Sequence, residues 1–131
     1  MVEKEFGMRE DNIRKLASGA KRDNNRGKGA YELISPFALE RLALVYERGI
    51  KKKGARSWEK GVSFGRCIQS AKRHIDQYMI GMENEDHLMQ ACFNLFAIAH
   101  YEECIKLGLL PKELDNLPRY LQKVKSIKKK K

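Results

Sequence analysis

Apolar residues recur at helical spacing over most of the chain after residue 35. The first such set comprises Leu39, Leu42, Ala43, Tyr46 and Ile50. Intervals of three and four residues place these side chains on one face of a helix. Ser35 suits the N-cap, Pro36 the first turn, and Gly54 the end of that helix. The pattern therefore predicts a helix over residues 36–53.

Two longer helices and one short helix follow in the same way. A second apolar repeat predicts a helix from Ser63 to about Ile80. The third runs from residues 84–86 to about Lys106, and its centre over 88–99 is apolar almost all round. Such a helix is typically buried in the middle of its protein. Residues 118–127 predict a last, amphipathic helix.

The remaining segments lack clear periodicity. Residues 1–30 are rich in glycine and charge and predict loop with one short helix near 9–17, and no strand is expected. The loop over 54–62 contains Trp58, which is either a lid packed on the core or a stacking surface for a base.

The predicted fold is all-α, a compact bundle of about four helices. An irregular segment, 1–30, packs on a helical domain, 31–118, and a terminal helix with a lysine-rich tail, 119–131, follows.

Composition indicates a globular protein in a reducing compartment. The chain is 42% hydrophobic and 34% charged, a mix that can form a core. No apolar run approaches ~18 residues, and the charged N-terminus does not resemble a signal peptide, so no membrane contact is expected. Cys67, Cys92 and Cys104 are odd in number and lack metal-type spacing. We interpret them as small core residues and expect a cytoplasmic location.

The formal net charge of +10 is concentrated at one end. Residues 119–131 carry seven basic side chains and no acid, whereas the other 118 residues carry 20 basic and 17 acidic groups. Such a tail is usually solvated and favours solubility or weak, nonspecific contact with nucleic acid.

A polar stripe on the third helix is the main candidate for chemistry. Its members are Asp86, His87, Gln90 and Asn94. They fall within about a third of the helix circumference, and unsatisfied buried polar groups cost ~1–3 kcal/mol each. The short connection before this helix predicts that helices two and three are antiparallel neighbours. Counting along them places His74 opposite Ala91, within reach of the stripe.

This cluster offers metal ligands, a titratable base and a cation. Arg73 would lie beside His74, with Glu83 and Glu85 at the mouth of the pocket. The alternative is purely structural. Residues 84–86 then cap the helix, the amides form an interhelical hydrogen-bond pair, and the histidine belongs to the core.

The residues also resemble a known family. The string SAKRHIDQYMIGMENEDHLMQACFNLFAIAHYEE is similar to the core of phage-type dATP/dGTP diphosphohydrolase N-terminal domains. In these, an arginine-histidine pair on one helix precedes Glu-Asp-His-Leu and an asparagine on the next. Those positions are here Arg73, His74, Glu85, Asp86, His87, Leu88 and Asn94. The resemblance extends through SGAKRDNNRGKGAYELISPFALERLA, SWEKGVSFGR and GLLPKELDNLP, and covers residues 16–118.

The resemblance implies an all-α domain related to MazG-like nucleoside-triphosphate pyrophosphohydrolases. Those enzymes cleave an NTP or dNTP between the α- and β-phosphates, use Mg²⁺ and assemble as dimers or tetramers. It implies a phage- or prophage-encoded, homo-oligomeric hydrolase with a purine-favouring site and Mg²⁺ or Mn²⁺ as cofactor.

The implied roles are metal binding, catalysis and substrate binding. Glu85, Asp86 and His87 would hold the metal, and His74, Asp86, His87 and Asn94 would form the catalytic set. Arg22, Lys28, Arg66 and Arg73 would bind phosphate, and Trp58 or Tyr31 would stack on the base.

The chain departs from the MazG-like pattern, in which each of two helices presents two carboxylates three residues apart. Here the second helix offers Arg73 and His74, and position 89 is methionine. Two hypotheses remain open. Either the metal is held differently, partly through His74 and His87, or the domain is a noncatalytic helical module that binds nucleotide or nucleic acid.

Overall fold

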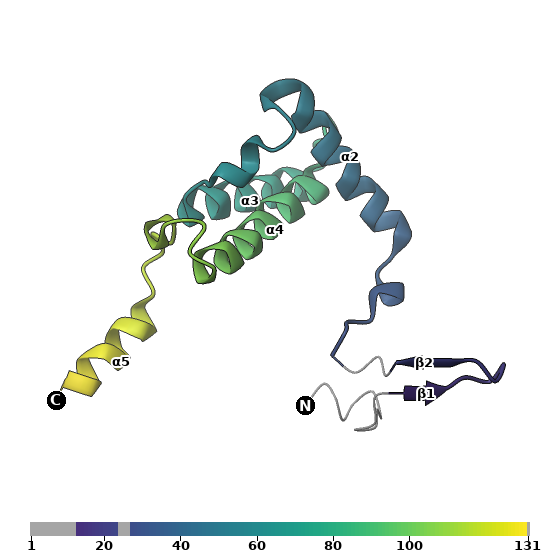
Figure 1. Cartoon of the computed structure of the whole chain (residues 1–131). Helices are drawn as coiled ribbons and strands as arrows, with labels where there is room; N and C mark the ends of the chain where they lie inside the picture. The colour runs from purple at the N-terminus through teal and green to yellow at the C-terminus, as the bar shows by residue number, and fades with distance from the viewer. Residues whose placement is uncertain (1–12, 24–26, 131) are drawn as a thin grey trace. The chain divides into compact units, whose positions relative to one another are not determined.

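The structure is a computed structural model that describes residues 13–23 and 27–130 (Figure 1). The chain divides into two compact units, Met1–Pro36 and Phe37–Lys131. The polar cluster identified in the sequence lies wholly in the second unit, so that unit carries the candidate site.

A β-hairpin occupies the described part of the first unit. Strand β1, Ile13–Lys15, pairs antiparallel with β2, Lys21–Asp23. The turn closes through hydrogen bonds from Leu16 N to Ala20 O (2.8 Å) and from Gly19 N to Leu16 O (2.9 Å). Gly19 has φ +90°, a conformation that glycine adopts at little cost. A single 3₁₀ turn, Tyr31–Leu33, follows.

The hairpin corrects the prediction for this segment. A short helix near 9–17 was expected and no strand, but residues 13–15 form a strand; residues 9–12 lie outside the described residues. Short polar strands have no apolar alternation, so the glycine of the turn was the signal that the sequence offered for this hairpin. The packing of residues 1–30 on the helical domain stays a prediction.

Four helices form the second part of the chain, and the all-α class is confirmed. They are α2 (Pro36–Lys53), α3 (Phe64–Met79), α4 (His87–Lys106) and α5 (Tyr120–Lys130). The 3₁₀ turns Ser57–Lys60 and Lys112–Leu114 lie between them. The predicted bounds agree to within a few residues, because cap residues and apolar spacing are local signals.

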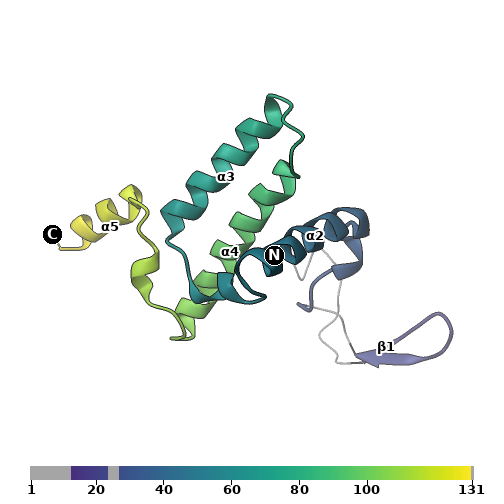
Figure 2. The same cartoon turned by 90° about the horizontal axis from the view of Figure 1, so that it is seen from above.

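Helices α3 and α4 form an antiparallel pair that positions the site. Figure 2 shows them side by side and joined by a short connection. Phe64, at the start of α3, stacks on Tyr101 near the end of α4, with ring centroids 6.5 Å apart. Cys67 and Ala97 complete this buried cluster. The predicted antiparallel arrangement is confirmed.

Trp58 closes the apolar end of this pair. Its ring lies edge-on to Tyr46 (centroids 5.7 Å apart) and to His100 (4.8 Å). Its backbone carbonyl accepts a hydrogen bond from the hydroxyl of Tyr101. Of the two interpretations of this tryptophan, the structure shows the lid packed on the core.

Helix α4 is less buried than its composition predicts. Leu95 and Phe96 are 46% and 57% exposed, although both lie in the apolar centre. The expectation of burial all round is therefore wrong for a single chain, because α2 and α3 cover only part of its circumference. None of the helices in the described ranges is long and apolar enough to cross a membrane.

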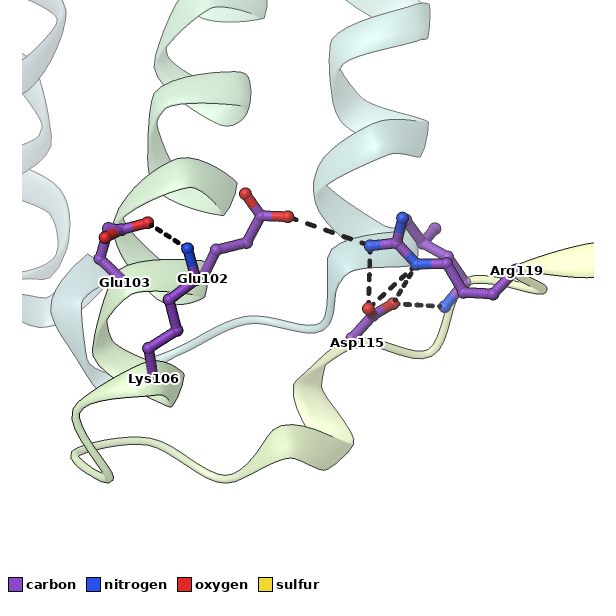
Figure 3. Close-up of polar contacts among 6 residues, drawn as sticks. Glu102, Glu103, Lys106, Asp115 and Arg119 are labelled. Atoms are coloured by element: carbon purple, nitrogen blue, oxygen red, sulfur yellow. Dashed lines mark hydrogen bonds and ion pairs between the residues drawn. The ribbon is translucent and has the colours of Figure 1, made fainter. Parts of the chain in front are cut away.

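The segment before α5 is tied to α4 by charge. Arg119 donates to Asp115 (Nη2 to Oδ2, 2.8 Å) and lies 4.0 Å from Glu102 on α4 (Figure 3). The Arg119 hydrogen bond holds the pKa of Asp115 below its usual value. The three cysteines are free thiols. Cys67 is buried, as expected for a core residue, whereas Cys92 and Cys104 are half-buried.

Candidate functional site

Two buried histidines meet at the polar end of the α3–α4 pair. His74, in the last third of α3, is 8% exposed, and His87, the first residue of α4, is 2% exposed. Their Nδ1 atoms lie 2.9 Å apart. Since neutral imidazole has one N–H and one lone pair, one ring donates this hydrogen bond and the other accepts it.

Asn84 decides which ring accepts. Its side-chain Oδ1 lies 2.8 Å from Nε2 of His87. An amide oxygen only accepts, so the hydrogen of His87 sits on Nε2 and its Nδ1 presents a lone pair. His74 therefore donates from Nδ1, and its own lone pair lies on Nε2.

Burial favours the neutral form of His74. Removal from water lowers the pKa of His74, and the neighbouring His87 and Arg73 lower it further, whereas the negative charge of Glu85 opposes them. A neutral imidazole near pH 7 can accept a proton or ligate a metal ion.

A carboxylate completes a set of three potential metal ligands. His74, Glu85 and His87 offer ligand atoms that all lie within 4.8 Å of one another. It is the one such group found in the part of the chain that the structure describes. Both histidines are buried and Glu85 is exposed, so the site is open to solvent on the carboxylate side. Of the three metal ligands predicted from the sequence, Glu85 and His87 belong to this group and Asp86 does not. The third member is His74.

Asp86 is engaged elsewhere. Its carboxylate caps α4 by accepting the Met89 N–H (3.2 Å). It also accepts a bidentate pair from Arg41 on α2, with Nε at 2.9 Å and Nη2 at 2.8 Å. The Arg41 hydrogen bond holds the pKa of Asp86 below its usual value. The structure shows Asp86 in the cap role, with both oxygens hydrogen-bonded, and its metal role stays a prediction.

Asn94 also lies apart from the histidines. Its amide donates to the carbonyl of Gln90 on its own helix (2.9 Å). The expectation that His74 would reach Gln90 and Asn94 is corrected: His74 bonds to His87, one turn nearer the start of α4.

The predicted phosphate-binding residues are exposed. Arg66 and Arg73 both project from α3, and Arg73 makes a long hydrogen bond to the Ser70 hydroxyl (3.4 Å). Arg22 and Lys28 are exposed in the N-terminal unit. Trp58 belongs to the aromatic cluster at the opposite end of the α3–α4 pair from His74 and His87.

Sequence reasoning missed two partners of the site. Asn84 was expected only as a possible cap, and Arg41 was not considered. The Asp86 cap was readable from sequence, because an acid before an apolar helix is a common start signal. The partner of this carboxylate is the guanidinium of Arg41, 45 residues earlier, so no local sequence pattern indicates the contact.

These features define an all-α domain in which two antiparallel helices hold a buried histidine pair beside a carboxylate, three potential metal ligands. A family model described as dATP/dGTP diphosphohydrolase, N-terminal, matches residues 18–108. The chain belongs to that family, and the match spans α2, α3 and α4 with the whole histidine site. Membership links the domain to nucleotide hydrolases. Neither the curated proteins nor the solved structures gave a match to the chain.

Proposed function

We propose that this domain is a metal-dependent (deoxy)nucleoside-triphosphate diphosphohydrolase encoded by a phage or prophage. It converts a purine-favoured dNTP to the monophosphate and pyrophosphate. The observation that carries the proposal is the buried His74–His87 pair beside Glu85, inside the segment that matches the hydrolase family.

The reaction places three demands on the site. A water must attack phosphorus so that the P–O bond between the α- and β-phosphates breaks, the negative charge must be neutralised, and the leaving pyrophosphate must be held. A bound divalent ion supplies charge neutralisation and a more acidic water. His74 and His87 would hold the ion or take up the proton of the water. Burial lowers the pKa of His74, which favours its unprotonated form for either role.

The arginines on α3 supply the cations for the triphosphate. Arg66 and Arg73 are exposed and lie two turns apart on the helix that carries His74. A guanidinium binds phosphate oxygens through two parallel N–H donors, which also orients the chain of phosphates. The exposed carboxylate of Glu85 leaves the site accessible to substrate.

A homo-oligomer is part of the proposal. Leu95 and Phe96 on α4, and Met79 and Ile80 at the end of α3, are all exposed apolar side chains. Covering them with a second copy of the chain would bury the part of α4 that one chain leaves open. Light scattering coupled to size exclusion measures the assembly directly.

The test is product analysis by chromatography. The purified protein is incubated with each dNTP and NTP, with Mg²⁺, with Mn²⁺ and with chelator. Metal-dependent formation of monophosphate and pyrophosphate from purine dNTPs is expected, and His74→Ala should abolish it. His100→Ala is the matched control, because it removes a histidine from α4 outside the site. Intact triphosphates in every reaction of well-folded protein would overturn the proposal.

The alternative is a noncatalytic nucleotide- or nucleic-acid-binding module, and helix α5 favours it. Every side chain over 120–129 is exposed, and the helix contains lysines and no acid. Deleting residues 120–131 should leave hydrolysis unchanged if the domain is an enzyme. In the alternative it would weaken polyanion binding and flatten the salt dependence.

A further inference from the structure

Of the two ions that the resemblance implies, Mg²⁺ and Mn²⁺, the donor atoms of the site fit Mg²⁺ poorly. Mg²⁺ takes oxygen ligands in near-ideal octahedral geometry. Two of the three donors here are imidazole nitrogens, from His74 and His87, and only Glu85 offers oxygen. Imidazole suits first-row transition ions such as Mn²⁺, Co²⁺ and Zn²⁺.

The spacing of the imidazoles is already close to that of a metal site. Their Nδ1 atoms lie 2.9 Å apart. Two nitrogens about 2.1 Å from one ion lie about 3.0 Å apart at a right angle and about 3.4 Å apart at a tetrahedral angle. An ion can replace the N–H···N hydrogen bond after the two nitrogens separate by a few tenths of an ångström and each ring turns so that its lone pair points at the ion. The proton on Nδ1 of His74 moves to Nε2 in that exchange, so no net proton is released.

Asn84 prepares one of the two ligands. Its Oδ1 accepts from Nε2 of His87 and so leaves the Nδ1 lone pair facing His74. Metal-ligating histidines almost always donate their second ring N–H to such an acceptor, which fixes the ring and its tautomer.

We propose that His74, His87 and Glu85 bind a first-row transition-metal ion in preference to Mg²⁺, with Asn84 as the residue that positions His87. Three protein ligands leave further coordination positions for water or a phosphate oxygen. The inference names the metal of the proposed hydrolase and in that sense rests on the proposed function. Metal binding is measured without nucleotide, so that the proposed metal preference and the proposed hydrolase activity can fail separately.

The experiment is calorimetric titration of the metal-stripped full chain with Zn²⁺, Co²⁺, Mn²⁺ and Mg²⁺, with Co²⁺ also followed by its visible d–d absorption. One ion per chain is expected, with Zn²⁺ and Co²⁺ bound at least ~100-fold more tightly than Mg²⁺. His87→Ala should remove tight binding, and His100→Ala should leave it intact. Equal affinity for Mg²⁺, or tight binding retained in His87→Ala, would overturn the proposal.

Four further variants keep the test decisive if His87→Ala does not fold. Glu85→Gln alters only an exposed side chain and should weaken Zn²⁺ and Co²⁺ binding. Asn84→Ala should weaken it by about 10–100-fold. Asn84→Asp should restore it, because a carboxylate accepts the same N–H. Asp86→Asn should leave affinity unchanged, and a loss there equal to that in Glu85→Gln would return Asp86 to the ligand set.

Discussion

The two ends of the α3–α4 pair are built from the same two helices and differ in what they bury. At one end Phe64 and Tyr101 are each 1% exposed and stack on one another, with Trp58 over them. At the other end His74 and His87 are nearly as buried and face each other through ring nitrogens. The burial of side chains alone therefore does not distinguish a hydrophobic core from a candidate functional site.

The energetics of the two ends differ. Burying an aromatic side chain stabilises a fold by about 1.5–3 kcal/mol. A neutral hydrogen bond contributes a net ~0.5–1.5 kcal/mol, and burial of each imidazole carries a desolvation cost. The histidine end thus adds little to the free energy of unfolding, so a ligand is the better explanation for its arrangement. The comparison predicts that substitutions at the two ends separate stability from activity.

The largest effect is expected at the aromatic end. Phe64→Ala should lower the free energy of unfolding by about 3–5 kcal/mol, because it empties a fully buried site between α3 and α4. Urea unfolding followed by circular dichroism measures the loss. Metal affinity per folded molecule should remain unchanged. A loss below about 1 kcal/mol would mean that this cluster is not the main core.

The second effect is expected at the histidine end and has the opposite character. The double variant His74→Leu/His87→Leu should reduce turnover at least ~100-fold. Its free energy of unfolding should stay equal or rise, since replacing both partners of a buried polar pair by apolar groups is nearly neutral or stabilising. Parallel assays of hydrolysis and urea unfolding test this. A marked loss of stability would contradict the distinction between the two ends.

A smaller, pH-dependent effect is expected for Tyr101→Phe. At pH 7 the free energy of unfolding of the variant should be about 1–3 kcal/mol lower than that of the wild type, because the Trp58 carbonyl no longer receives its hydrogen bond.

Burial raises the pKa of Tyr101 to about 12 from the usual 10.0. The unfolded chain then loses this proton first, and the folded wild type loses stability as pH rises from about 10 to 12, by up to ~2.7 kcal/mol. The variant lacks the ionisable hydroxyl, so its free energy of unfolding does not fall for this reason. The difference in free energy of unfolding between wild type and variant should therefore shrink over that range. Unfolding curves at pH 7, 10 and 11.5 measure it, and a constant difference would contradict the assignment.

The smallest effect is expected away from both ends. Asp115→Asn should lower Tm by less than about 4 °C, because Asp115 and Arg119 form a largely solvated pair (Figure 3). The pKa of Asp115 is lowered in the folded state, so its contribution is present above pH 3.8 and is lost as pH falls through the folded pKa. Glu103→Gln, in a more exposed pair with Lys106, is the matched control and should change Tm less. Calorimetry at pH 7 and pH 3 makes the comparison.

The sequence by itself determined the helices and the family. The bounds of α2, α3 and α4 follow from apolar spacing, from Pro36 in the first turn and from the cap at Asp86. The arginine-histidine and Glu-Asp-His motifs led to the family that matches residues 18–108. Helix signals are local, because each cap or turn is set by residues a few positions apart.

Only the tertiary structure decided which polar groups meet. A stripe on one helix has several members, and an axial offset of one turn, about 5.4 Å, decides which of them faces a given side chain opposite. Here that offset pairs His74 with His87 and leaves Asn94 on its own helix. The contact of Arg41 with Asp86 joins residues 45 positions apart. Periodicity fixes a face but no axial position, and the grouping of these polar side chains depends on both.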